Sequence, residues 1–348
     1  MNRISNINIA CEYPLPTPAE ILKEIPLTTT AEENVFNARA QVEAILKRTD
    51  KRLLLICGPC SIDNPDSAWE YALRFRKLSQ QVSHRFFPIM RTYFEKPRTT
   101  VGWKGLVYDP DLDQSFQIEK GLRTARKLLL KLAEAGIPAA TEFLEPIIPQ
   151  YIADLISWAS IGARTSESQT HRQLASGMSM PIGFKNSTDG SVAIAVDAVK
   201  TAAASHSFLG VINDGRTGVF STKGNPLCHI VLRGGSHAPN YTSEFIAFTK
   251  ELMRKKKVPT PAIVIDCSHA NSDKNPANQP KVLNDVLSQI NSGENAIAGI
   301  MLESYLLGGR QDITPNHKPG LSLTDACLSW DETEQIVLDA CKALDKTF

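Results

Sequence analysis

From residue 53 onward, short runs of apolar residues alternate with longer segments whose apolar positions recur at helical spacing. The runs lack alternating polar residues, which is typical of strands that are buried on both faces of a parallel sheet. In one intervening segment, 115–136, we expect a helix with Ser115 as its cap and Gly136 as its stop. The eight runs lie at 53–56, 86–90, 138–140, 158–162, 181–184, 229–232, 262–265 and 297–302.

Eight β/α units in series predict an α/β fold, a (β/α)₈ TIM barrel. A doubly wound open sheet is the alternative, because both folds produce the same alternation of strands and helices.

Two segments fall outside this alternation. Residues 1–28 are polar and proline-rich and indicate an extended arm, and Thr30 to Glu33 form a capping-box pattern before a helix that ends near Lys47. The segment 206–222 has two short apolar stretches around Asn213-Asp214-Gly215, a pattern that predicts a β-hairpin inserted before the sixth core strand. We therefore divide the chain into an N-terminal arm and helix (1–50) and a barrel (51–348).

Composition excludes several classes of function. The 348 residues are 42% hydrophobic and 22% charged, with a formal net charge of +1, which argues against a nucleic-acid or membrane-surface protein. The first residues lack the apolar core of a signal peptide, so a cytoplasmic protein is expected. Seven cysteines, spread from Cys11 to Cys341, do not indicate a disulfide framework.

In a barrel of this kind, the active site forms where the strands end. Here nearly every apolar run is followed by a side chain that can bind an anion or a metal. In chain order these residues are Cys60, Arg91 with Lys96, Glu142, Arg164, Lys185, Arg233, His269 and Glu303.

The first chemical group among them is cationic. Like charges held a few ångströms apart repel one another by a few kcal/mol, so a cluster of this size predicts a multiply charged ligand such as phosphates with a carboxylate. The alternative is that Glu95, Glu142 and Glu167 pair with some of these cations within the protein. The cluster comprises Arg91, Lys96, Arg98, Arg164, Lys185 and Arg233, and much of it lies in the long loop 91–104.

The second group offers one thiolate, one imidazole and two carboxylates, from Cys60, His269, Glu303 and Asp325. Such donors suit one divalent first-row ion, Mn, Fe, Co or Zn, better than Ca²⁺ or Mg²⁺. The sequence Cys57-Gly58-Pro59-Cys60 also resembles a redox motif, but it ends a buried strand. We therefore interpret Cys57 as a core residue and only Cys60 as part of the site.

The candidate site residues lie in the motifs ICGPCSID, MRTYFEKPRTTVGWKGL, GARTSESQTHR, GFKNSTDG, HIVLRGG, DCSHANSDK and MLES followed by LTDAC. Taken together, these motifs resemble those of the metal-dependent 3-deoxy-D-arabino-heptulosonate 7-phosphate (DAHP) synthases of the microbial feedback-regulated class I type. The resemblance extends over essentially the whole chain. It implies condensation of phosphoenolpyruvate with erythrose 4-phosphate, the first step of the shikimate pathway.

The resemblance also implies residue roles. Cys60, His269, Glu303 and Asp325 match the metal ligands. Arg98 and Thr99 match positions that receive the aldose phosphate, and Lys96, His269 and Glu142 are candidates for proton transfer. The chain departs from many relatives at Asp63-Asn64, where they have His-Asp. The positions that match the phosphoenolpyruvate site are Arg91, Lys96, Arg164, Lys185 and Arg233.

The resemblance likewise implies feedback control by an aromatic amino acid and a homotetramer or homodimer. In the family, the N-terminal arm and helix (here 1–50) and the inserted hairpin help to form the effector pocket and the subunit contacts, so we expect roles in oligomer contacts and regulation for them. Glycine at 210, where phenylalanine-regulated relatives tend to have serine, leaves room for a phenol oxygen and favours tyrosine, with phenylalanine second. Two alternatives stay open, a sister enzyme that condenses phosphoenolpyruvate with arabinose 5-phosphate and a non-catalytic anion-binding barrel. The positions that match the effector pocket are Pro149, Gln150, Met178, Ser179, Phe208, Gly210 and Phe220.

Overall fold

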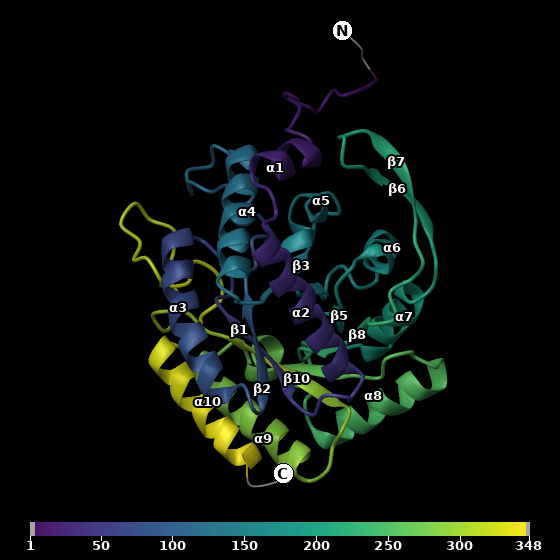
Figure 1. Cartoon of the computed structure of the whole chain (residues 1–348), viewed down its shortest axis with the longest axis vertical. Coiled ribbons are helices and arrows are strands. Elements are labelled where there is room, and N and C mark those ends of the chain that lie inside the picture. The colour runs from purple at the N-terminus through teal and green to yellow at the C-terminus, as the bar shows by residue number, and fades with distance from the viewer. Residues whose placement is uncertain (1–3, 346–348) are drawn as a thin grey trace.

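The computed structural model describes residues 4–345 and contains a closed barrel of eight parallel strands surrounded by helices (Figure 1). The strand order around the barrel is β1-β10-β9-β8-β5-β4-β3-β2, so the first strand pairs with both the second and the last. This confirms the (β/α)₈ barrel and excludes the open doubly wound sheet. The barrel strands are β1 Leu53–Gly58, β2 Phe86–Arg91, β3 Ala139–Phe143, β4 Trp158–Ile161, β5 Ile182–Lys185, β8 His229–Leu232, β9 Ile263–Asp266 and β10 Ile297–Glu303.

Every residue of these eight strands is buried, because alternate side chains pack into two different layers. In β1, Leu54 and Ile56 join the cluster that fills the barrel, whereas Leu55 and Cys57 join the layer between strands and helices. The barrel cluster also includes Val42 and other apolar residues of α2 (Thr29–Leu46), so this helix packs against the barrel core.

The helices occupy the segments that separate the strands. The predicted helix 115–136 is α4, but it begins at Ile118 after Gln117, and Ser115 does not cap it. Gly136 does end it, with a φ of +70° that favours glycine. The remaining helices are α3 Pro65–Val82, α5 Pro149–Ile152, α6 Gln169–Gly177, α7 Val192–Ala202, α8 Ser243–Lys256, α9 Gln279–Asn291 and α10 Trp330–Asp345, with short 3₁₀ turns η1 Ala153–Leu155, η2 His269–Ser272 and η3 Pro276–Asn278.

The N-terminal arm is less extended than the sequence predicts. It contains a short helix, α1 (Pro18–Glu24), in which the Thr17 side chain and the Glu20 carboxylate cap each other's backbone. The proline content obscured this capping box, although proline is well suited to the first turn of a helix. In α2 the cap is Thr28, two residues before the predicted Thr30.

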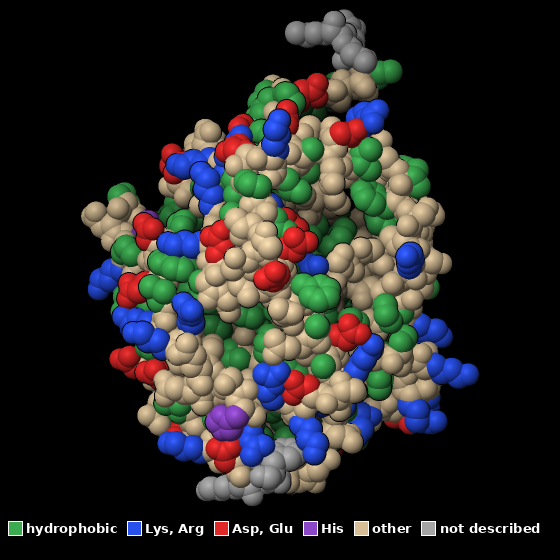
Figure 2. Space-filling model, viewed as in Figure 1, with side chains coloured by type: hydrophobic (Ala, Val, Ile, Leu, Met, Phe, Trp, Pro, Cys, Tyr) green, Lys and Arg blue, Asp and Glu red, His purple; other side chains and the backbone are tan. Residues whose placement is uncertain are grey.

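The inserted hairpin is confirmed. Strands β6 (Ser207–Val211) and β7 (Thr217–Ser221) follow α7 in the chain and precede β8. They pair antiparallel and lie outside the barrel, close to α1 in Figure 1. Its outward-facing residues Leu209 and Val219 are 74% and 67% exposed, and Figure 2 shows apolar side chains along this edge of the molecule.

The charged side chains of both signs are interspersed over the face shown in Figure 2. Within residues 4–345, no helix combines the length and the apolar character needed to cross a membrane.

Candidate active site

The carboxyl ends of the barrel strands form one rim, and the register of the sheet explains why the predicted residues meet there. Gly58 pairs with Glu303, so the turn that carries Cys60 begins beside the end of β10. On the other side, β2 ends at Arg91 next to Ala140, two residues before Glu142. Residues from both halves of the chain therefore face a common space.

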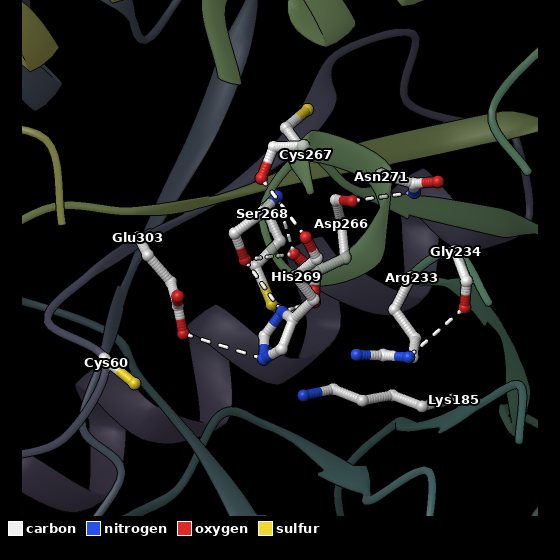
Figure 3. Close-up of polar contacts among 12 residues, drawn as sticks. Cys60, Lys185, Arg233, Gly234, Asp266, Cys267, Ser268, His269, Asn271 and Glu303 are labelled. Carbon is white, nitrogen blue, oxygen red and sulfur yellow. Dashed lines mark hydrogen bonds and ion pairs between the residues drawn. The ribbon is translucent and has the colours of Figure 1, made fainter. Parts of the chain in front are cut away.

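The four predicted metal ligands lie together at this rim. Ligand atoms of Cys60, Glu303 and Asp325 lie within 4.8 Å of one another, and His269 Nε2 lies 3.7 Å from Glu303 Oε1 (Figure 3). A sulfur, a nitrogen and carboxylate oxygens around one point suit a borderline divalent ion. Burial raises the pKa of the Cys60 thiol, and the Glu303 carboxylate adds to the rise, so binding an ion here releases a proton.

His269 is held in place by its own loop. Its Nδ1 lies 2.8 Å from Asp266 Oδ2 and 2.8 Å from Ser268 Oγ, while Ser268 Oγ donates to Asp266 Oδ1 at 2.6 Å (Figure 3). Asn271 Nδ2 donates to the Asp266 carbonyl oxygen at 2.9 Å and supports the turn. The φ of His269 is +55°, a conformation that residues other than glycine seldom adopt and that clusters at functional sites. The loop thus turns Nε2 toward Glu303.

Arg91 forms the floor of the site and is fully buried. Its guanidinium donates to Glu303 Oε1 at 3.0 Å and to the Cys60 carbonyl oxygen at 3.3 Å, and it lies 3.8 Å from the centre of the Tyr93 ring. Gly58 lets the backbone of β2 lie close to the end of β1, since a Cβ on Gly58 would lie 2.8 Å from the Arg91 carbonyl oxygen. Arg91 therefore neutralises Glu303 and fixes the Cys60 turn.

Lys96 joins the metal-ligand group to the open part of the site. Its Nζ lies 3.0 Å from Cys60 Sγ and 3.2 Å from the Cys60 carbonyl oxygen. Burial lowers the pKa of Lys96, but the adjacent Cys60 and Glu303 charges raise it above its ordinary value.

Lys185 and Glu142 form a buried ion pair, with 2.6 Å between Nζ and Oε2. Burial alone would raise the pKa of Glu142, but the Lys185 ammonium outweighs burial and brings the pKa to about 2. Glu142 is therefore an anion at neutral pH. Of the carboxylates considered as alternative partners for the cations, Glu142 does pair with Lys185, whereas the side chain of Glu95 accepts from the backbone N–H groups of Leu144 and Glu145.

The mouth of the site is a cavity of about 250 Å³. Arg98, Thr99, Arg164 and Arg233 line it, together with Lys96 and Lys185, whereas Arg91 lies beneath. Arg164 Nη2 donates to Thr99 Oγ1 at 2.9 Å. Within residues 4–345, no carboxylate lies within 4.0 Å of the Arg98, Arg164 or Arg233 side-chain nitrogens.

Comparison with known proteins decides the family. The DAHP synthetase I family model matches residues 24–338. The chain belongs to the DAHP synthetase I family. It is 47% identical to the Tyr-sensitive phospho-2-dehydro-3-deoxyheptonate aldolase of Escherichia coli (96% of this chain, 94% of the other) and 49% identical to the Phe-sensitive enzyme (94% and 93%). It is 47% identical to the Trp-sensitive enzyme, with full coverage of both.

A solved structure from the same family agrees with the fold. The phospho-2-dehydro-3-deoxyheptonate aldolase from Francisella tularensis SCHU S4 superposes with a TM-score of 0.96 at 44% identity, covering 98% of this chain and 100% of the other. The chain is thus an enzyme of the DAHP synthase class, which removes the non-catalytic barrel as an alternative.

A second, larger cavity of about 1080 Å³ lies between the hairpin, α2, α5 and α6. The Phe208 and Phe220 rings stack there with 5.7 Å between their centres. A Cβ on Gly210 would lie 2.8 Å from Phe220 Cε2, so any larger residue would displace that ring. All seven residues that the DAHP synthetase I resemblance assigns to the effector line this cavity: Pro149, Gln150, Met178, Ser179, Phe208, Gly210 and Phe220.

At Asp63-Asn64, where many relatives have His-Asp, the structure explains the residue at one of the two positions. Asn64 caps α3, accepting from the Ser67 N–H at 2.9 Å. Asp63 is 4% exposed, and burial raises its pKa to about 6. It lies beside Tyr305 in the core rather than in the cavity at the rim.

Sequence reasoning missed two residues. Asp266, which orients His269, directly follows the apolar run 262–265, so the rule that identified strand-end residues could have found it. Lys274 also lines the mouth. The 3₁₀ turn η2 and the positive φ angles of Asp273 and Lys274 bring it there, and no sequence pattern identified this backbone conformation.

Proposed function

We propose that this chain condenses phosphoenolpyruvate with D-erythrose 4-phosphate and water to give DAHP and inorganic phosphate. The observation that carries the proposal is the single rim at which metal-type donors lie beneath a mouth lined by arginines that, among residues 4–345, have no carboxylate within 4.0 Å. This reaction is the first step of the shikimate pathway toward the aromatic amino acids, which fits the sensitivity of the relatives to tyrosine, phenylalanine and tryptophan.

The charges of the site support two anionic substrates. Arg91 and Lys185 are paired with protein carboxylates, whereas Arg98, Arg164 and Arg233 have none within 4.0 Å among the described residues. Guanidinium groups bind phosphate and carboxylate through two parallel hydrogen bonds. We assign Arg164, Lys185 and Arg233 with Lys96 and Arg91 to phosphoenolpyruvate, and Arg98 with Thr99 to the aldose phosphate.

The donor set fits one divalent first-row ion, Mn, Fe, Co or Zn, held by Cys60, His269, Glu303 and Asp325. When bound, such an ion supplies Lewis-acid polarisation of the aldehyde oxygen. The buried Asp266 carboxylate supports this assignment, because a metal-binding imidazole usually donates its other N–H to a carboxylate.

In the reaction, C3 of phosphoenolpyruvate attacks the aldehyde carbon, water adds at C2 and phosphate leaves. The new alkoxide needs a proton. Glu142 cannot give one, because its pKa of about 2 and its ion pair with Lys185 keep it ionised. His269 has Nδ1 directed at Asp266 and Nε2 at Glu303. We therefore favour Lys96, whose Nζ carries N–H donors at the boundary between the metal-ligand group and the cavity.

The test is a phosphate-release assay with erythrose 4-phosphate or arabinose 5-phosphate as the aldose, each with and without chelator. We expect turnover with the four-carbon aldose only, and its loss on chelation. The Cys60→Ala variant should be folded but inactive with any metal. Turnover with arabinose 5-phosphate alone would assign the chain to the sister reaction, and full activity of Cys60→Ala after chelation would contradict the metal assignment.

For regulation, we propose tyrosine as the inhibitor and phenylalanine as the weaker one. The relatives do not discriminate, since Tyr-, Phe- and Trp-sensitive enzymes are 46–49% identical to this chain. The argument rests on Gly210, which leaves the space next to Phe220 without a side chain in the cavity of about 1080 Å³. Titrating the three aromatic amino acids against activity tests this, and inhibition by phenylalanine alone would contradict it.

We also propose that residues 1–50 and the hairpin 206–222 form contacts in a homodimer or homotetramer, while 51–348 form the catalytic barrel. Apolar residues of both segments face solvent, among them Ile7 at 70%, Tyr13 at 63% and Leu209 at 74% exposure. Light scattering on the full chain and on Leu209→Ser measures the assembly, and a monomeric full chain would contradict the proposal.

A further inference from the structure

A second cluster of metal-type side chains lies at the opposite end of the barrel. His84 is in the turn between α3 and β2, two residues before that strand begins, so it is far from the rim at which the strands end. Cys341 and Asp345 belong to the end of α10, which packs along α3 (Figure 1). One ligand atom from each of the three residues lies within 4.8 Å of the others.

The helix provides the geometry of this cluster. Cys341 and Asp345 are four positions apart on α10 and therefore share one face of it. His84 Nε2 lies 3.5 Å from Cys341 Sγ and 3.4 Å from Asp345 Oδ2. The thiol belongs to a residue that is only 4% exposed, whereas the side chains of His84 and Asp345 are 55% and 43% exposed. An ion can thus enter from solvent and reach a sulfur at the inner end.

The distances match those of coordinated ligands. A tetrahedral zinc ion with nitrogen and oxygen at about 2.0–2.1 Å and sulfur at about 2.3 Å places the nitrogen about 3.3 Å from the oxygen and about 3.6 Å from the sulfur. The observed separations, 3.4 Å from the nitrogen to Asp345 Oδ2 and 3.5 Å from the nitrogen to the sulfur, are close to these edges. Three protein ligands leave the fourth position for water.

The neighbouring Arg85 is compatible with this arrangement. Its Nε donates to Asp345 Oδ1 at 2.6 Å and so fixes the carboxylate. The second oxygen, Oδ2, is the one left for an ion, because a carboxylate has about four acceptor sites on two oxygens. A surface ion pair between His84 and Asp345 would be the simpler interpretation, but it gives the inward-lying thiol of Cys341 no role.

We propose that His84, Cys341 and Asp345 form a second binding site for a borderline divalent ion, with Zn²⁺ as the expected occupant. The mixed sulfur, nitrogen and oxygen donors favour Zn²⁺ over Ca²⁺ and Mg²⁺. The ion links the end of α10 to the turn before β2. It adjoins a cavity of about 540 Å³ that His84, Arg85 and Leu344 line at the amino-terminal end of the strands.

The experiment counts bound ions on the full-length protein. After dialysis against Zn²⁺ and removal of free metal, elemental analysis should give two ions per wild-type chain and one per Cys341→Ser chain. Cys11→Ser is the matched control, because Cys11 is an exposed cysteine outside the cluster, and it should retain two. The comparison between wild type and Cys341→Ser does not depend on the assignment of Cys60.

A spectroscopic measurement isolates the second site. In a Cys60→Ser background, Co²⁺ should give a thiolate charge-transfer band. Titrating this band, we expect His84→Gln to lower the affinity for Co²⁺ at least about tenfold and Cys341→Ser to abolish the band. Circular dichroism checks the fold of each variant. If the Cys60→Ser background does not fold, the comparison of zinc counts between wild type and Cys341→Ser still tests the proposal. Equal zinc counts in wild type and Cys341→Ser would overturn the proposal, as would a band that survives Cys341→Ser.

Discussion

Asp266 Oδ2 lies 2.8 Å from His269 Nδ1, and a carboxylate in this position favours the proton on Nδ1, so replacing Asp266 by asparagine should change the favoured tautomer. Asp266 Oδ1 already accepts from the Ser268 N–H at 3.0 Å and from Ser268 Oγ at 2.6 Å, while Oδ2 lies 2.8 Å from His269 Nδ1. The oxygen of the asparagine amide would stay with the two Ser268 donors. Its NH₂ group would then face Nδ1, which must accept, so the ring proton moves to Nε2.

The expected cost follows from this change of tautomer. A protonated Nε2 cannot bind a metal ion. In Asp266→Asn, metal binding therefore requires the proton to move back to Nδ1, where the N–H would face the NH₂ group of the asparagine. Substitutions of such supporting carboxylates weaken metal affinity about 10–100-fold, or about 1.4–2.8 kcal/mol. Burial alone would raise the pKa of Asp266, but His269 and Lys185 hold it well below its ordinary value, so the carboxylate is ionised. Replacing this buried charge by an amide therefore also affects the stability of the fold.

The assay is metal affinity, measured by competition with a chromophoric chelator, with urea unfolding recorded separately. Ser268→Ala is the matched control: Ser268 Oγ is also 2.8 Å from Nδ1, but its removal leaves the carboxylate facing the ring. We expect a clearly larger loss of affinity for Asp266→Asn than for Ser268→Ala. A folded Asp266→Asn protein that binds metal like the wild type would refute the reasoning.

Three further predictions concern other parts of the chain. Lys185→Met leaves the buried Glu142 anion without its partner, so the free energy of unfolding in urea should fall by about 3–5 kcal/mol, and Glu142→Gln in the same chain should restore part of it. Burial raises the pKa of Glu95 from 4.5 to about 8, so its protonation stabilises the fold fully below pH 4.5 and no longer above pH 8. Glu95→Gln should therefore lose less stability than wild type between pH 5.5 and 8.5, by a few kcal/mol at about 1.4 kcal/mol per pKa unit. Gly210→Ser should weaken inhibition by tyrosine roughly tenfold relative to phenylalanine, which dose–response curves with each amino acid would measure.

The barrel strands could be predicted from sequence because each is buried on both faces, which removes polar residues from the run. The hairpin could be predicted because its turn sequence, Asn213-Asp214-Gly215, suits a hairpin. Helix starts were less predictable: Ser115 and Thr30 looked like caps, but α4 begins at Ile118 and α2 is capped by Thr28. A cap depends on the local φ and ψ, and several neighbouring serine and threonine residues carry the same signal.

The composition of the candidate site was visible in the sequence, but its internal pairing was not. Arg91 pairs with Glu303, 212 positions away, and Lys185 pairs with Glu142, 43 positions away. These partners are determined by the neighbour relations of β1, β2 and β10 and of β3, β4 and β5 in the closed barrel. Sequence alone suggested Glu95 as a partner because it is close in the chain, whereas its carboxylate accepts from the backbone of the next strand's loop.

Depth and pairing together separate the buried Arg91 and Lys185 from the exposed Arg164, and this difference predicts different consequences of losing them. Arg233 is an intermediate case, because it is 8% exposed and has no carboxylate within 4.0 Å among the described residues. Arg91 and Lys185 are buried, and a buried charge is costly unless the protein neutralises it, so both have carboxylate partners. Arg164 is exposed at the mouth, where water tolerates an unpaired charge until an anion arrives.

Arg164→Ala should therefore leave the free energy of unfolding unchanged within about 0.5 kcal/mol. The KM for phosphoenolpyruvate should rise about 10–100-fold, because a hydrogen bond to a charged group contributes about 1.5–3 kcal/mol. Steady-state kinetics and urea unfolding on the same preparation measure both. If Arg164→Ala destabilised the fold as much as Lys185→Met and left KM unchanged, the mouth arginines would be structural rather than substrate-binding, and the division by depth would be wrong.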